Sequence, residues 1–239
     1  MEIAVACFTK RPAMYPNILS NILSQTRRPD VVSIVAHREV GDLDTVVTRL
    51  KSHGIPKVVT EVVGGEFTLF DVQRLAYSSA DSVMGEDGSI SSFEDDDWYG
   101  PGYLAEVERT FLDHPDAVAT GKNEFVMRCI SDGKVSERLC FSGGMLPGGA
   151  CSNVAGPSIS IRVAAWREFE QLRFNPQGPG KRDFPDMAFR EGLLEICRVG
   201  TDHSIELPLY ATGKENFAVQ RYKATAHDHT WKYLPPEFR

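Results

Sequence analysis

Short stretches rich in apolar residues alternate with helical repeats along the first half of the chain. The stretches indicate strands, which are predicted over residues 3–8, 31–36, 57–63, 89–93 and 117–120. Between them, apolar residues recur at helical spacing, which predicts helices over residues 17–26, 43–50, 67–80 and 103–112. Strands that alternate with helices indicate an α/β fold with a mainly parallel sheet and helices on both faces. Ligands of such sheets bind beyond the carboxyl ends of the strands.

The pattern changes in the second half of the chain. Alternating stretches on either side of an Asp-Gly pair at 132–133 predict a hairpin over residues 125–142. A further strand is predicted over residues 158–162, followed by a helix through Trp166. A loop rich in Pro and Gly then leads to a helix that begins at Asp186, and the aromatic-rich tail is predicted to be irregular.

Length and composition are those of an ordinary globular protein. The chain has 239 residues, of which 42% are hydrophobic and 25% charged, with a net charge of −7. We expect a single domain over residues 1–239, with a nucleotide-type half over about 1–121 and an acceptor-type half over about 122–239. No apolar run has the length of a membrane span, the N-terminus lacks a basic leader, and the five cysteines form no Cys-x-x-Cys pair. We therefore expect a cytoplasmic protein with reduced thiols and no membrane span.

Four consecutive acids, residues 94–97, follow the predicted strand 89–93 and precede Trp98 and Tyr99. Adjacent carboxylates repel each other, and a divalent cation would offset that repulsion. The spacing Glu94-x-Asp96 suits Mg²⁺ or Mn²⁺, which take few protein ligands and fill the remaining positions with phosphate oxygens. Charge runs are more often solvated turns. The position after a buried strand favours the cation site.

Two later segments carry further candidate chemistry. His229, in the stretch HDHTW, could complete the ligand shell of a divalent metal, or it could be an ordinary surface or packing histidine. Asp183 and Asp186, in the stretch KRDFPD, could include a base that faces an acceptor hydroxyl. An acid at the start of a helix is also commonly a cap.

The loop after the first strand, Thr9-Lys10-Arg11, lies where a nucleotide base or phosphate would bind in an α/β sheet. Neither G-x-G-x-x-G nor the P-loop motif is present in the sequence, which disfavours dinucleotide and P-loop chemistry. A G-x-S-x-G elbow is also absent, so the sequence does not suggest acyl-transfer hydrolysis.

Taken in order, several stretches resemble the GT-A fold nucleotide-sugar glycosyltransferases, in particular the family-two-like inverting group. The stretches are ACFTKRP, SNILSQTRRPDVVSIVA, SFEDDDWYGPGYL, FPDMAFREG and the terminal HTW. They span most of the chain, and the most specific parts are Q-T-x-x-P-D and E-D-D-D-W-Y-G-P-x-Y-L. The resemblance implies a metal-dependent enzyme that moves a sugar from a nucleotide-diphosphate sugar to an acceptor hydroxyl.

The resemblance also implies roles for individual residues. Asp186, with Asp183 as a rival, would be the general base, and Asp96 and His229 would bind Mn²⁺ or Mg²⁺. Glu94 would take the first D-x-D position against the ribose, and Thr9 and Arg11 would lie against the base. The full candidate set for binding the nucleotide sugar is Thr9, Arg11, His37, Arg74, Glu94, Asp95 and Asp97.

This sequence departs from the family pattern in three places. The second strand ends in His37-Arg38 instead of the pair of acids that usually contacts the nucleotide, so this strand does not identify the nucleotide, and a UDP-sugar is taken only as the default donor. The first D-x-D acid is Glu94, and the later acidic motif reads Pro185-Asp186. A nucleotidyltransferase and a non-catalytic sugar- or cation-binding module therefore remain alternatives.

The expected acceptor is soluble, such as a glycan, a protein, a small molecule or a hydroxylated DNA base. Net charge disfavours a nucleic-acid acceptor, although a local basic face in the acceptor half would permit one. The residues that could form this face are Arg162, Arg167, Arg173, Lys181, Arg182, Arg221 and Lys223.

Overall fold

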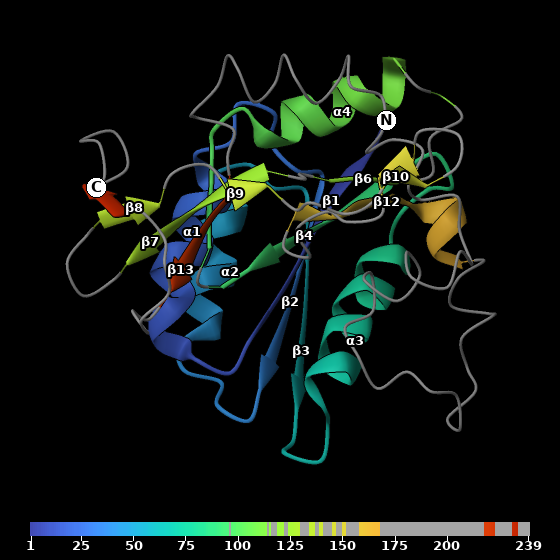
Figure 1. Ribbon diagram of the computed structural model, residues 1–239. Helices are drawn as coiled ribbons and strands as arrows, with labels where there is room; N and C mark the ends of the chain where they lie inside the picture. The colour runs from blue at the N-terminus through green and yellow to red at the C-terminus, as the bar shows by residue number, and fades with distance from the viewer. Residues whose placement is uncertain are drawn as a thin grey trace.

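A six-stranded sheet forms the centre of the protein and carries the strand ends at which the candidate residues lie (Figure 1). The computed structural model describes residues 1–95, 97–113, 115, 119–121 and 158–167. Of the remaining chain it describes the backbone of the strands at 124–129, 134–136, 139–140, 145–146, 150–151, 218–222 and 231–233.

The strand order of this sheet is β3-β2-β1-β4-β12-β6. The first four strands run parallel, and β12 pairs antiparallel with β4 and with β6. The expected α/β fold with a mainly parallel sheet is therefore confirmed, with an antiparallel end added. The strands are β1 (Ile3–Thr9), β2 (Val31–His37), β3 (Lys57–Val63), β4 (Ser89–Glu94), β6 (Ala119–Thr120) and β12 (Ser160–Arg162).

Helices cover both faces of the sheet, as expected (Figure 1). Helix α3 packs on one face, and α1, α2 and α4 pack on the other. A 3-10 turn, η1 (Pro12–Met14), precedes α1, and residues 163–167 are helical as predicted. The four long helices are α1 (Tyr15–Leu23), α2 (Leu43–Ser52), α3 (Leu69–Asp81) and α4 (Tyr103–Asp113). Among the described helices, none has the length and apolar character to cross a membrane.

Helices α1 and α3 differ from their predicted bounds for reasons that the contacts show. Helix α1 ends at Leu23 because the next residues bind the segment before α4: Gln25 Nε2 lies 2.9 Å from the Gly100 carbonyl oxygen, and Thr26 N lies 2.8 Å from the Pro101 carbonyl oxygen. Helix α3 begins two residues later than predicted because Thr68 is its N-cap, in a reciprocal capping box with the side chain of Asp71.

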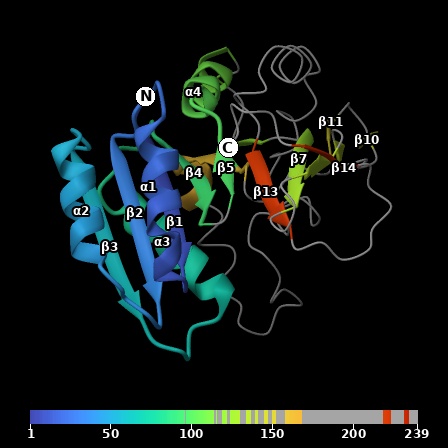
Figure 2. The ribbon, with the colours of Figure 1, turned by 90° about the vertical axis from the view of Figure 1, so that its left-hand side faces the viewer.

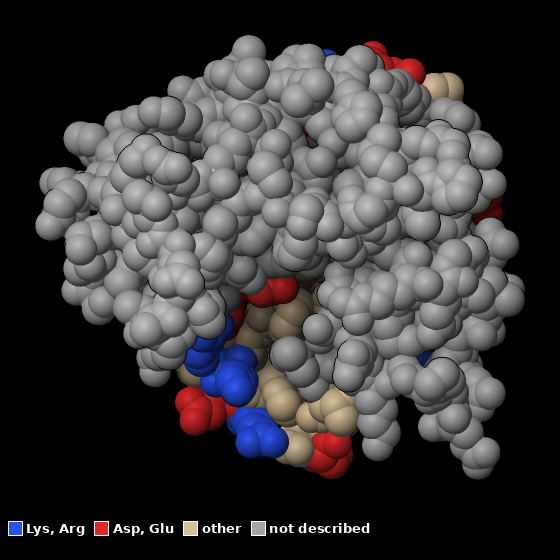
Figure 3. Space-filling view, viewed as in Figure 1, with Lys and Arg blue, Asp and Glu red and all other residues tan. Residues whose placement is uncertain are grey.

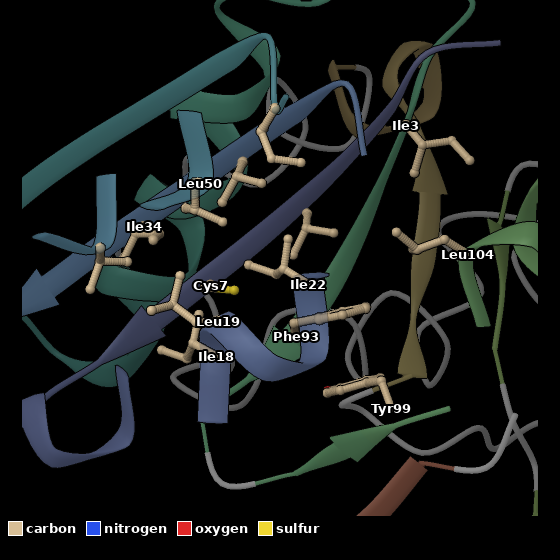
Figure 4. Packing of buried hydrophobic residues seen from close by; sticks show 14 of the residues in the cluster. Ile3, Cys7, Ile18, Leu19, Ile22, Ile34, Leu50, Phe93, Tyr99 and Leu104 are labelled. Carbon is tan, nitrogen blue, oxygen red and sulfur yellow. The ribbon is translucent and has the colours of Figure 1, made fainter. Parts of the chain in front are cut away.

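Both faces of β1, β2 and β4 are buried, which explains the nearly continuous apolar sequences of β1 and β2. In β1, Ala4 and Ala6 face α3, whereas Ile3, Val5 and Cys7 face α1 and α2. Figure 4 shows the second of these cores, with the side chains of α1, β1, β2 and β4 in contact. The thiol of Cys7 is fully buried there, and burial raises its pKa well above the ordinary value.

A second sheet, of order β14-β8-β7-β13-β5, lies beside β4 (Figure 2). The predicted hairpin is confirmed, since Arg128 of β7 and Val135 of β8 are antiparallel partners. The strands beyond the first sheet are β5 (Trp98–Tyr99), β7 (Glu124–Cys129), β8 (Lys134–Ser136), β9 (Leu139–Cys140), β10 (Met145–Leu146), β11 (Ala150–Cys151), β13 (Ala218–Tyr222) and β14 (Trp231–Tyr233).

The prediction of an irregular tail is wrong for two segments of it. Strand β13 pairs antiparallel with β5 and parallel with β7, and β14 pairs antiparallel with β8. Val219, for example, is the register partner of both Trp98 and Val126. These partners are far away in the sequence, so the local pattern of the tail does not show the pairing.

Candidate functional site

The carboxyl ends of β1, β2 and β4 place three candidate residues at one edge of the sheet. Thr9 of β1 is the register partner of Ala36, which precedes His37, and Phe8 is the partner of Glu94. The loops after these strands begin at this edge. Figure 3 shows a recess in this part of the molecule, with acidic side chains at its inner end and a row of basic side chains, with acidic ones beside them, at one side of its opening. This is the edge at which the sequence predicts a ligand site.

The carboxylate of Asp95 is held by the loop after β1. Its Oδ2 accepts a hydrogen bond from the Thr9 hydroxyl, and the Arg11 guanidinium binds both of its oxygens, with Arg11 Nε 3.1 Å from Oδ2. Asp95 is buried, whereas the Arg11 side chain is half-exposed. A two-point pair of this kind fixes the direction of the guanidinium as well as its position. Part of the repulsion within the acidic run is therefore offset by a cation of the protein itself.

The other acids of the turn differ in exposure. Asp97 is fully buried, and Glu94 is half-buried at the end of β4. The hydroxyl oxygen of Tyr99 accepts a hydrogen bond of 2.9 Å from the Glu94 N–H. Burial first, and the charges of Asp97 and Glu94 next, raise the pKa of Tyr99 well above its ordinary value. Tyr99 is therefore neutral at physiological pH.

Side-chain amides on one face of α1, and that of Gln25 two residues after the helix, hold the backbone of the acidic turn. Asn17 Nδ2 donates to the carbonyl oxygens of Asp95 (2.9 Å) and Asp97 (2.8 Å). Asn21 Nδ2 donates to the same Asp97 oxygen (2.8 Å), and Asn21 Oδ1 accepts from Tyr99 N (3.1 Å). Gln25 continues the series: its Nε2 donates to the Gly100 carbonyl, and its Oε1 accepts from the backbone N–H of Leu104 (3.0 Å).

Our interpretation of the sequence missed this row of amides, although the signal is present. Asn17, Asn21 and Gln25 are spaced four residues apart, so they share one face of a helix. Two of them, Asn21 and Gln25, are buried. Buried amides need hydrogen-bond partners, and a row of them on one face predicts an irregular segment packed there.

An aromatic cluster adjoins the acidic turn, and Figure 4 shows two of its members, Phe93 and Tyr99. The rings of Phe93 and Tyr99 are stacked with a centroid distance of 3.9 Å and an interplanar angle of 3°. Tyr103 meets Phe93 edge-on at 5.8 Å, and all three rings are almost completely buried. These three rings therefore pack against one another next to the acidic turn.

His37 is the last residue of β2, and Arg74 lies on α3, which packs on the face of the sheet opposite α1. Only 7% of His37 is exposed, and its Nε2 has no hydrogen-bond partner among the described residues. The backbone leaves β2 through Arg38, which has a φ of 72°, a value rare for residues other than glycine. Arg74 lies on α3, where its charge contributes to lowering the pKa of Asp71, although hydrogen bonds from Thr68 are the largest cause.

Four of the candidate residues, Asp96, Asp183, Asp186 and His229, lie outside the described residues. Within the described part of the chain, no three His, Cys, Asp or Glu side chains are grouped so that they could hold a metal ion. The described acids therefore do not form such a group by themselves. A metal site that includes Asp96 or His229 is not tested by the structure.

The hypothesis of a basic face finds no support in its two described members. Arg162 donates to the Phe111 carbonyl oxygen at 2.8 Å and lies over the Phe111 ring at 4.6 Å. Arg167 pairs with Asp81 at 2.8 Å. Both guanidinium groups therefore bind within the fold. The side chains of the other five lie outside the described part of the chain.

Comparison with known proteins gives a likeness of fold. No protein-family model matches the chain, and no curated protein matches it. Among solved structures, residues 1–349 of S. aureus TarS in complex with UDP-GlcNAc match with a TM-score of 0.51 at 11% identity, covering 95% of this chain. The same TarS residues in complex with UDP match with a TM-score of 0.44 at 11% identity, covering 98% of this chain. In both cases this chain spans 60% of the TarS chain. The protein thus has an α/β fold of the GT-A type, with the candidate residues at the carboxyl edge of its parallel strands.

Proposed function

We propose that this protein is a glycosyltransferase that moves a sugar from a nucleotide-diphosphate sugar, by default a UDP-sugar, to an acceptor hydroxyl. The observation that carries the proposal is the contact between the end of β1 and the acidic turn. Thr9 and Arg11 bind the carboxylate of Asp95, and they do so at the strand ends where an α/β sheet binds its ligands. The fold shared with a TarS chain in complex with UDP-GlcNAc supports the choice of donor.

In this proposal the described residues have different roles in binding the nucleotide sugar. Arg11 is half-exposed and held at two points by Asp95, so its guanidinium is already oriented at the strand ends and could meet a phosphate or a base without a large loss of side-chain entropy. Asp95 then serves mainly to orient Arg11, because both of its carboxylate oxygens are already engaged. Glu94 and Arg74 stay candidate contacts of the nucleotide sugar, and Asp97 supports the turn from its buried position.

The proposal includes Mn²⁺ or Mg²⁺, with Asp96 and His229 as its ligands. When bound, the ion would neutralise charge that develops on the diphosphate leaving group. Attack by the acceptor hydroxyl would proceed with inversion at the anomeric carbon, with Asp186 or its rival Asp183 as the general base. The type of sugar is proposed to be a hexose, and the acceptor a soluble hydroxyl compound.

A thermal-shift panel tests the donor and the ion together. Ligands that bind only the folded state raise Tm, so we expect UDP-GlcNAc or another UDP-sugar to raise Tm, and to do so more with Mn²⁺ than with EDTA. A shift with nucleoside triphosphates alone would favour a nucleotidyltransferase. A shift with Mn²⁺ or free sugar but with no nucleotide would favour the binding module. A folded protein that responds to no nucleotide sugar would contradict the proposal.

Replacing His37 with leucine separates a ligand contact from a packing role. Since Nε2 lacks a partner among the described residues, we expect the free energy of unfolding to stay the same or to rise by about 1 kcal/mol. If His37 binds the nucleotide, the Kd for UDP should nevertheless rise by about tenfold, the equivalent of one buried hydrogen bond. Urea unfolding and calorimetric titration measure the two quantities. Loss of stability with an unchanged Kd would assign His37 to packing alone.

A further inference from the structure

The acidic turn is held through its backbone by neutral groups. Asn17 Nδ2 bridges two carbonyl oxygens, those of Asp95 and Asp97, at 2.9 and 2.8 Å. These two residues flank Asp96 in the sequence. Asn21 adds a second bond to the Asp97 carbonyl and fixes the N–H of Tyr99, so that the entrance and the exit of the turn are both tied to α1.

Hydrogen bonds from neutral side-chain amides suit a turn that binds ions. A carboxamide donates hydrogen bonds to carbonyl oxygens without neutralising any neighbouring carboxylate. A lysine or arginine on this face of α1 would pair with the acids, as Arg11 does with Asp95. The amides therefore fix the shape of the turn and leave its charge to a cation or to the Arg11 loop.

We propose that Asn17 is a positioning residue for the acidic turn, and that it sets the affinity of the site for the nucleotide and its metal ion. The inference rests on the proposed function. Asn17 is preferred to Asn21 as the residue to test, because Asn21 is only 1% exposed and also holds Tyr99. Asn17 is half-buried, so its replacement perturbs packing less.

The test compares Asn17→Leu with Ser20→Ala, a change at an exposed residue of the same helix. The first readout is hydrogen exchange of the backbone amides of residues 94–99, which needs no ligand. We expect exchange in Asn17→Leu to be about two- to tenfold faster, as for the loss of one or two hydrogen bonds. The second readout is the Kd for UDP with Mn²⁺, which we expect to rise about 10- to 100-fold, as for residues that orient metal ligands. Ser20→Ala should match the wild type in both.

The outcomes separate this inference from the proposed function. Unchanged exchange in Asn17→Leu, or faster exchange with an unchanged Kd in a wild type that binds UDP, overturns the positioning role alone. A wild type that binds no UDP with or without Mn²⁺ overturns both. If Asn17→Leu does not fold, Asn17→Ala removes the same donor without adding a charge or a larger side chain, and the same two effects are expected of it. A merely structural Asn17 would lower Tm and leave the Kd of the folded variant unchanged.

Discussion

Phe93→Ala is expected to lower the free energy of unfolding by about 3–5 kcal/mol, the range for a large aromatic residue removed from a core. Phe93 is only 1% exposed, stacks on Tyr99 at 3.9 Å and meets Tyr103 edge-on at 5.8 Å. Its removal leaves a cavity and deletes both ring contacts. For a chain of this size, Tm should fall by about 6–20 °C. Urea unfolding followed by circular dichroism measures the change.

Two control variants make this result specific. Leu112→Ala removes a large apolar side chain that is 66% exposed, and should change the unfolding free energy by less than about 0.5 kcal/mol. Phe93→Leu keeps most of the apolar volume but loses the ring stack, so its loss of unfolding free energy should lie between those of Leu112→Ala and Phe93→Ala. A loss below about 1 kcal/mol in Phe93→Ala would show that the cluster can close over the gap and that the stack contributes little.

The cluster also links stability to the site. Phe93 directly precedes Glu94, and Tyr99 receives the Glu94 N–H on its hydroxyl oxygen. The cavity left by Phe93 would therefore loosen the packing of Tyr99, and with it both the start and the end of the acidic turn. We expect nucleotide affinity to fall in Phe93→Ala even under conditions in which the variant remains folded.

The sequence predicts the central sheet well because burial there is two-sided. Strands β1 and β2 are apolar on both faces, so short apolar runs indicate them directly, whereas β4 is buried on both faces with serines among its residues. The rule that ligands bind beyond the carboxyl ends of such strands then places Thr9, His37 and Glu94 at one edge. Their register confirms this placement without any information from the side chains.

What the sequence does not show depends on distant partners. Asp95 meets Arg11 across 84 positions, and the pairing of β5 with β13 joins segments separated by roughly half of the chain. No local pattern encodes such pairs. The charge run indicated a missing cation, and Arg11 supplies one for Asp95 from a loop that we considered only as a nucleotide contact. The four-residue spacing of Asn17, Asn21 and Gln25 in the sequence indicates that they share one helical face, but it does not indicate their hydrogen-bond partners on the turn.

Asp186→Asn is expected to lower the rate of UDP release from the bound UDP-sugar by about 100- to 10,000-fold, the contribution typical of a general base. Release to water needs no knowledge of the acceptor, because the same carboxylate that deprotonates a hydroxyl would deprotonate water. Asparagine has the shape of aspartate but cannot take up the proton at neutral pH. The Kd for the donor should therefore change by less than about twofold, since the change removes an interaction of the transition state alone.

Asparagine also separates catalysis from capping at this position. The sequence predicts a helix that begins at Asp186, and asparagine caps helices about as well as aspartate does. A residue that only caps would thus tolerate the change with full turnover and unaltered Tm. Asp183→Asn is the matched variant, three residues away in the same stretch. Loss of turnover in Asp183→Asn alone would move the base to Asp183. Full turnover in both variants would mean that neither acid is the base, and inversion by a general base in this stretch would have to be abandoned.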